Sequence, residues 1–186
     1  PPGTMFITRE AFSPHEDDLT KMFSKSLTAR FAHEIAHQWW GNQVSWPDDE
    51  EEWISESFAE YCSALQVRAE KGKGAYNDVV RDWEGRMKQS GVAATLPTAN
   101  RIEGEMAFLD RMGLLYGRGP FLLAVIHHEI GEEKFLTFLK TFQSNRKWNT
   151  GSSALVADLL HYLTGKSWTD FFDRYYWGTE YPVLKK

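Results

Sequence analysis

Residues 33–37 read HEIAH: two histidines stand four positions apart, with a glutamate directly after the first. A third acidic residue, Glu56, follows in a second segment with a helical pattern. Two imidazoles and one carboxylate supply three protein ligands to one metal ion and leave a fourth position open for water. This arrangement is typical of a catalytic zinc site and not of a structural one. The sequence therefore predicts a zinc site formed by His33, His37 and Glu56.

The four-residue spacing explains how one helix presents both histidines to the same ion. An α-helix advances about 100° per residue, so positions four apart lie on the same face. Glu34 is offset around the helix from His33 and cannot easily join the ligands. It can instead accept a proton from a zinc-bound water, whose pKa falls to about 7, as hydroxide attacks a carbonyl. We therefore expect Glu34 to act as a general base.

Hydrophobic spacing and the positions of glycines predict a mostly helical chain with one short strand, residues 5–8, near its start. The helix that carries the histidines is expected to end at Gly41 and to bury a stripe of Phe31, Ile35 and Trp39. The expected helices cover residues 19–40, 51–71, 73–90, 114–130, 132–145, 152–164 and 167–177, with glycines punctuating several of their ends.

Two other groups of polar residues have both a functional and a structural interpretation. Glu60 lies one turn after Glu56, where it either accepts a hydrogen bond from a ligand histidine or is a solvated carboxylate. Residues 127–129, HHE, contain metal-ligand types but lack the four-residue helical spacing, so we expect a partly solvated helix end there. The carboxylates of residues 48–52 are expected in the first turn of a helix, where the helix dipole favours them, and not in a cation-binding loop.

The residues around the predicted ligands form a longer pattern. Residues 33–42 read HEIAHQWWGN, residues 53–61 read WISESFAEY, and eighteen residues separate His37 from Glu56. This pattern resembles the gluzincin zinc aminopeptidase family, which includes aminopeptidase N and leukotriene hydrolase. The resemblance implies one Zn²⁺ per chain and a peptide substrate.

Two later segments extend the resemblance over most of the chain. Residues 116–123, YGRGPFLL, are similar to the family's tyrosine segment, and residues 171–184 to the end of its catalytic domain. The resemblance implies that Tyr116 donates a hydrogen bond to the developing oxyanion. It also implies that residues 1–186 form a single domain, the helical part of a thermolysin-like catalytic domain whose sheet lies mainly upstream.

The chain departs from the family pattern in three places. The family's motif glycine-x-methionine-glutamate-asparagine uses its glutamate to hold the substrate's free amino group, but residues 3–7 read GTMFI and lack both polar residues. Ser55 and Ser57 flank Glu56 where asparagine and glycine are usual, and Arg118 stands where lysine is common. Either the amino-anchoring motif lies upstream of the first residue, or this protein does without it.

These residues lead us to expect a zinc metallopeptidase that removes N-terminal amino acids by glutamate-assisted attack of a zinc-bound water. The missing anchor motivates a first alternative, which is a zinc endopeptidase or another zinc hydrolase. A non-catalytic scaffold domain that retained the fold is the second alternative. The presence of Glu34 together with all three ligands argues against that scaffold.

Composition excludes several other functions. The net charge of −5 gives no support for nucleic-acid binding, which requires a basic stripe. No apolar run reaches the roughly 18 residues that a membrane span needs. Cys62 is the only cysteine, so the chain cannot form an internal disulfide. Because residues 1–3 read PPG without an initiator Met, we expect a piece of a longer protein with further domains, whose compartment the sequence does not indicate.

Overall fold

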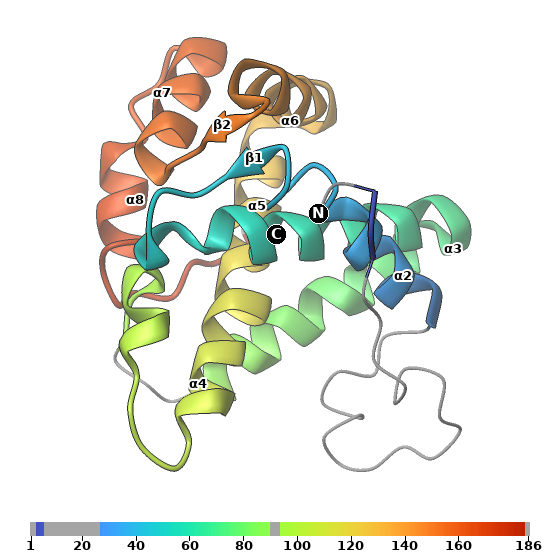
Figure 1. Ribbon diagram of the computed structural model, residues 1–186. Coiled ribbons are helices and arrows are strands. Elements are labelled where there is room, and N and C mark those ends of the chain that lie inside the picture. Colours follow the sequence, from blue (N-terminus) through green and yellow to red (C-terminus); the bar gives the residue numbers. More distant parts are fainter. Residues whose placement is uncertain (1–2, 6–26, 90–93, 185–186) are drawn as a thin grey trace.

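The computed structural model describes residues 3–5, 27–89 and 94–184, and these are mostly helical, as predicted (Figure 1). The strand predicted at residues 5–8 falls on residues 6–8, outside the described part, and on Met5, which is not in a strand. The helices are α2 (Leu27–Ala36), α3 (Trp53–Gln89), α4 (Ala107–Gly113), α5 (Gly119–Ile130), α6 (Glu132–Arg146), α7 (Ser153–Thr164) and α8 (Thr169–Tyr175). Shorter elements are the 3₁₀ helices Asp49–Glu51 and Leu96–Arg101, the π-helical turn Leu114–Arg118, and the parallel strand pair β1 (Val44–Ser45) and β2 (Asn149–Thr150). Within these described residues, no helix has both the length and the apolar character needed to cross a membrane.

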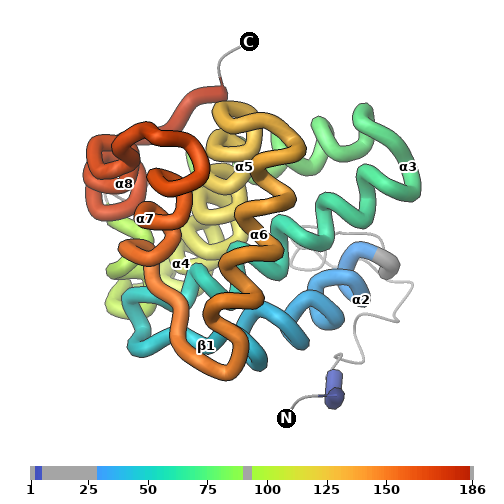
Figure 2. Tube along the Cα trace, turned by 90° about the horizontal axis from the view of Figure 1, so that it is seen from above, coloured from blue at the N-terminus to red at the C-terminus, as the bar shows by residue number. Residues whose placement is uncertain are grey.

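Helix α3 consists of two arms that meet at a sharp bend. Gly72 has φ 84° and ψ 177°, a backbone conformation that glycine adopts without the steric cost that a side chain would add. The first arm, residues 53–71, lies beside α2, and the second arm, residues 73–89, turns back toward the body of the protein (Figures 1 and 2). The predicted helix end at Gly72 and the new helix after it are therefore confirmed.

Aromatic rings anchor the first arm of α3 in the core. Trp53 and Phe58, both fully buried, contact each other with ring centroids 5.3 Å apart. Trp53 also packs on Tyr176 at 5.2 Å, and Phe58 stacks on Phe142 of α6 at 6.0 Å. Ring pairs at such separations add about 0.5–1.5 kcal/mol each beyond the burial of their area. The arm that carries Glu56 is thus held in place by α6 and by the chain just after α8.

The acidic run before α3 has a structural role. The Asp48 side chain caps the 3₁₀ turn by accepting a hydrogen bond from the Glu50 backbone N–H at 3.0 Å. The buried carboxylate of Glu51 accepts hydrogen bonds from Ser153 Oγ at 2.7 Å and from Tyr176 O–H at 3.1 Å. The run therefore ties the start of α3 to α7 and to the end of α8, which supports the expectation of a helix start over that of a cation site.

The buried face of α2 differs from the predicted one. Ile35 and Trp39, expected in the buried stripe, are 47% and 44% exposed. The side that packs against α3 instead carries His33 together with Ala29 and Ala36, all below 9% exposed. Alanine side chains let two helices approach closely, so this face brings the histidine onto α3. The helix also ends at Ala36, four residues before the predicted end, and continues as a turn.

Arg118 is a buried structural residue. Its side chain is 1% exposed, and its guanidinium donates hydrogen bonds to the backbone carbonyls of Ala94 at 3.1 Å and Tyr175 at 3.0 Å. It also donates to the carbonyls of Gly178 at 2.6 Å and Glu180 at 2.9 Å. The single charged group therefore fastens the segment after α8 to the turn that carries Tyr116.

Replacement of Arg118 by methionine is expected to lower the free energy of unfolding by about 3–5 kcal/mol. The change removes four hydrogen bonds donated by a charged group, each contributing about 1.5–3 kcal/mol, and water offsets part of this loss because the residues that carry the four carbonyls are half-buried or exposed. Urea denaturation followed by circular dichroism measures the loss. The control Arg101→Met removes an exposed arginine that pairs with Glu50, and should cost less than about 1 kcal/mol. Equal losses in both variants would contradict the role of Arg118.

Candidate metal centre

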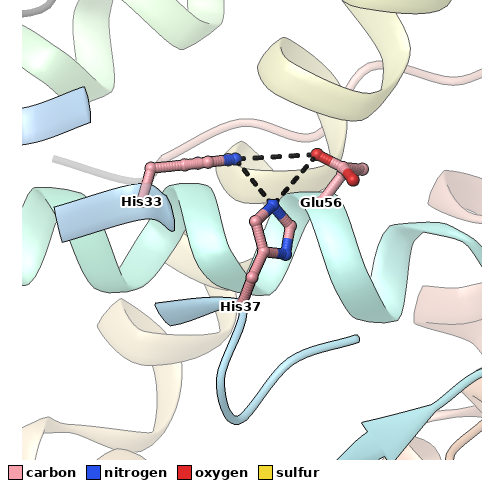
Figure 3. Close-up of side chains that lie close together, drawn as sticks. All are labelled: His33, His37 and Glu56. Atoms are coloured by element: carbon pink, nitrogen blue, oxygen red, sulfur yellow. Dashed lines mark hydrogen bonds and ion pairs between the residues drawn. The ribbon is translucent and has the colours of Figure 1, made fainter. Parts of the chain in front are cut away.

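The side chains of His33, His37 and Glu56 converge on one point between α2 and α3 (Figure 3). The Nε2 atoms of the two histidines are 3.1 Å apart, and each lies 3.6 Å from Glu56 Oε2. Ligands about 2.05 Å from a tetrahedral zinc ion lie about 3.3 Å from one another. The three atoms thus already have nearly the separations that such an ion requires.

Local helix geometry produces this convergence. His33 lies on the face of α2 that packs on α3, and its ring meets His37 edge to face with centroids 4.7 Å apart. His37 follows the last helical residue, but its backbone N–H still bonds the His33 carbonyl at 3.2 Å. That bond preserves the helical four-residue relation, so both rings point toward α3, where Glu56 lies in the first turn.

Further residues hold the outer nitrogen of each imidazole. His33 Nδ1 lies 3.1 Å from Glu60 Oε2, and His37 Nδ1 lies 2.9 Å from the Trp40 carbonyl and 3.3 Å from Ser55 Oγ. A hydrogen bond donated from Nδ1 fixes the ring and leaves the lone pair of Nε2 for a metal. Both outer nitrogens therefore have the partners that histidine ligands commonly have.

Glu60 contacts a histidine of the site and is not a solvated carboxylate. Of the two interpretations of the sequence, the structure therefore supports the hydrogen bond to His33. Its side chain is fully buried, and its second oxygen accepts a hydrogen bond from Trp83 Nε1 at 3.0 Å. Trp83 lies on the second arm of α3, so the bend at Gly72 is what brings this donor to the site. The two arms together fix the orientation of His33.

Glu60→Gln is expected to weaken zinc binding by about 10- to 100-fold, since the loss of a group that orients a ligand typically has this effect. Glutamine keeps the size of the side chain but removes the negative charge that stabilises the proton on His33 Nδ1. Competition with a chromogenic chelator measures the affinity. The matched control is Glu70→Gln, an exposed residue on the same arm of α3, which should leave the affinity unchanged. Unchanged affinity in Glu60→Gln would contradict the assignment.

Electrostatics keep Glu56 negatively charged. Burial alone would raise its pKa, but the interactions with His33, the charge of His37 and the hydrogen bond from Tyr116 outweigh it and lower the pKa to about 2. A carboxylate that is ionised at neutral pH is the form that binds a metal ion. The site therefore offers one anionic oxygen and two imidazole nitrogens.

Tyr116 lies directly beside these groups. Its hydroxyl donates a hydrogen bond to Glu56 Oε2, and its ring stacks on that of His33 at 5.7 Å. The residue belongs to a π-helical turn, an element often found at functional sites, and Ser57 Oγ bonds the neighbouring Leu115 carbonyl at 2.7 Å. Burial, and then the charge of Glu56, raise the pKa of Tyr116 well above its usual value, so the phenol keeps its proton.

Glu34 follows His33 on α2 and has a partly buried side chain. Its role as a proton acceptor stays a prediction, as do the roles of the three converging residues in metal binding. An ion pair that the sequence pattern did not indicate joins Arg111 to Glu52, with Arg111 Nη2 2.8 Å from Glu52 Oε1. Both groups act electrostatically on Tyr116, and the one available signal was that Glu52 stands one turn before Glu56.

Comparisons with known proteins agree with this geometry. Residues 2–175 match the family described as Peptidase family M1 domain. A leucyl aminopeptidase from Saccharolobus solfataricus is 30% identical over 161 residues, which cover 77% of this chain and 20% of the relative. Aminopeptidase N from Lactococcus lactis is 24% identical over 189 residues, which cover 95% of this chain and 21% of the relative. The chain thus spans about a fifth of the length of these curated relatives.

Solved structures share the fold. The crystal structure of an M1 zinc metallopeptidase from Deinococcus radiodurans has a TM-score of 0.70 at 23% identity and covers 88% of this chain and 35% of its own. The structure of native yeast LTA4 hydrolase has a TM-score of 0.69 at 16% identity and covers 88% of this chain and 28% of its own. At these identities the similarity is one of fold, and it corresponds to the helical part of those proteins.

Proposed function

This chain belongs to peptidase family M1, and from that membership and the geometry of its site we propose that it carries the catalytic centre of a zinc-dependent aminopeptidase. The observation that supports the proposal most strongly is the convergence of His33 Nε2, His37 Nε2 and Glu56 Oε2 at separations of 3.1–3.6 Å. Because the chain spans only about a fifth of its curated relatives, the proposal concerns the protein that contains it.

The donor set fits zinc. Two imidazoles and one carboxylate suit Zn²⁺, whereas Mg²⁺ and Ca²⁺ prefer sites made of oxygen atoms. His33, His37 and Glu56 would hold one ion per chain. When bound, zinc acts as a Lewis acid on a carbonyl oxygen and lowers the pKa of water to about 7.

The remaining chemistry is assigned to two residues of the chain. Glu34 accepts the proton of the attacking water and passes it to the amine that leaves the cleaved peptide bond. Tyr116 keeps its proton, because its pKa is raised by burial and by Glu56, and donates it in a hydrogen bond to the oxygen that becomes negative during attack. A nucleophilic residue is not required, since water attacks directly.

Recognition of the free amino group is supported by the two aminopeptidase relatives and by the position of residues 3–5. The Gly3 backbone N–H donates to Gln38 Oε1 at 2.6 Å, and Gln38 Nε2 donates to the Thr4 carbonyl at 3.2 Å. The segment that begins like the amino-anchoring motif therefore lies beside the side chain of Gln38, the residue that follows His37. Its lack of a carboxylate favours a second candidate, a zinc endopeptidase or another zinc hydrolase.

Substrates with free and blocked N-termini distinguish the two candidates. The zinc-loaded full-length protein is incubated with aminoacyl coumarin amides and with the same compounds acetylated at the N-terminus. An aminopeptidase should cleave the free compounds and leave the acetylated ones nearly intact. Cleavage of blocked peptides alone would overturn the aminopeptidase proposal in favour of the endopeptidase.

Tyr116→Phe is expected to lower kcat by about 10²- to 10³-fold, the usual effect of removing one donor to a developing oxyanion. KM and zinc content should change little, because phenylalanine keeps the ring that stacks on His33. Steady-state kinetics and metal analysis measure the three quantities. The control Tyr162→Phe changes a tyrosine that is 83% exposed and should have wild-type kinetics. A variant that lost its zinc would show that Tyr116 acts on Glu56 and not on the oxyanion.

A further inference from the structure

A pocket of about 300 Å³ lies at the bend of α3 and shares no residue with the candidate metal centre. Both arms of α3 line it, together with the end of α5, the start of α6 and Leu184. Its volume is at the lower end of the range for small-molecule sites and corresponds to about ten water-sized groups. The pocket therefore suits a small ligand.

One wall of the pocket is a continuous chain of hydrogen bonds. Tyr76 and Tyr61 join their hydroxyls at 2.7 Å, and the Tyr61 hydroxyl lies 2.6 Å from His127 Nδ1. His127 Nε2 lies 2.9 Å from Glu132 Oε2, to which Arg68 Nη1 donates at 2.5 Å. His127 is buried, whereas His128 and Glu129 are exposed near the end of α5, so the partly solvated helix end expected at residues 127–129 is confirmed. Each group is held by its neighbours, and the wall is preorganised.

The charges around the pocket leave an excess of positive charge. Arg68 and Glu132 neutralise each other, and the remaining N–H groups of Arg68 form no hydrogen bond within the described part of the chain. Lys73, on the opposite arm of α3, has no ion pair or hydrogen bond to any described residue. Asn77 and His128 add further donors to the lining. The lining of the pocket thus carries one positive charge, that of Lys73, that no described side chain neutralises.

The rest of the lining is apolar. Val80 and Ala124 are buried, and Leu184 and the ring of Tyr76 complete this side. A lining that combines cationic and apolar side chains fits a ligand that has a charged end and a short hydrocarbon body. A phosphate group carries about two negative charges, and Lys73 balances only one of them. The second charge would lie close to the Glu132 carboxylate, which disfavours phosphate.

We propose that this pocket binds a small organic carboxylate. The carboxylate lies between Arg68 and Lys73, where it accepts hydrogen bonds from both cations. The hydrocarbon body packs against Val80 and Ala124. The ligand is either a free short-chain acid or the C-terminal carboxylate of an amino-acid derivative, since both present the same two chemical features.

Titration calorimetry on the zinc-loaded full-length protein tests the proposal with 4-methylpentanoate, N-acetyl-leucine, 4-methylpentanol and inorganic phosphate. We expect saturable binding of one or both carboxylates, and none of the alcohol; the tighter of the two acids identifies the source of the carboxylate. Lys73→Gln should weaken binding about tenfold, the effect of losing one charged hydrogen bond. Lys71→Gln, an exposed neighbour outside the lining, should bind normally.

A second variant separates this pocket from the zinc ion, which can also bind carboxylates. Asn77 is exposed and lines the pocket, so Asn77→Trp fills the space without disturbing the core and should abolish binding. Carboxylate binding that persists in both Lys73→Gln and Asn77→Trp would place the ligand elsewhere and overturn the proposal. Equal binding of the alcohol, tighter binding of phosphate, or no binding of either acid would also overturn it.

Discussion

Glu34→Gln is expected to lower kcat for peptide hydrolysis by about 10²- to 10⁴-fold, while zinc content stays at the wild-type value. Glutamine has nearly the same size as glutamate but cannot accept the proton of the attacking water. The three converging atoms of the metal centre belong to other residues, so the ion should still bind. Kinetics with an aminoacyl coumarin amide and metal analysis of the same preparation measure both effects.

The control for this substitution is Glu133→Gln, which makes the same chemical change at an exposed glutamate in the first turn of α6. Wild-type activity is expected there. If Glu34→Gln kept full activity together with its zinc, the general-base assignment would be wrong. If it lost its zinc as well, Glu34 would be acting on the metal centre and not on the proton.

The placement of His33 and His37 on one helical face was predictable because its information is local, whereas the approach of Glu56 from α3 was implied by the family resemblance. A helix fixes the relation between His33 and His37 through spacing alone, and one further turn relates Glu56 to Glu60. The break at Gly72 was predictable for a similar reason, since a glycine between two helical patterns marks a positive φ. In each case a few neighbouring residues determine the geometry, whatever packs around them.

The partners of the centre were not predictable from spacing. Trp83 reaches Glu60 only because α3 bends back on itself, and Arg111 reaches Glu52 across 59 positions. Such contacts depend on how the helices pack, which the residue pattern does not encode locally. Arg118 is a similar case, because its four carbonyl partners lie 24 to 62 positions away and identify it as structural only in the folded chain.

The apolar periodicity of α2 did not predict which side of the helix is buried. Ile35 and Trp39, expected in the buried stripe, are exposed, and Trp39 lies beyond the end of α2, because α3 packs on the side that carries Ala29, His33 and Ala36. The spacing of apolar residues identifies a stripe along a helix, but it does not show which side of the helix packs against another element. The alanines at positions 29 and 36 were the better guide, since they let His33 approach the ligand on α3.

His37→Ala is expected to lose its zinc, and with it all measurable hydrolysis. Zinc binding by four ligands is worth about 10–16 kcal/mol in small domains, so one ligand contributes roughly 3 kcal/mol, or between two and three orders of magnitude in affinity. His37 follows the last residue of α2 and is only partly buried, so its removal should leave the helices intact. Metal analysis after dialysis measures the loss, and circular dichroism checks the fold.

The control His161→Ala removes an exposed histidine that bonds the Lys166 carbonyl, and it should keep one zinc ion per chain. Stoichiometric zinc in His37→Ala would refute the assignment of this ligand. The result is interpreted by comparison with Glu34→Gln, because hydrolysis is expected to fall in both variants, whereas only His37→Ala is expected to lose the metal. Loss of activity with zinc retained identifies a residue that moves protons, and loss of both identifies a residue that holds the ion.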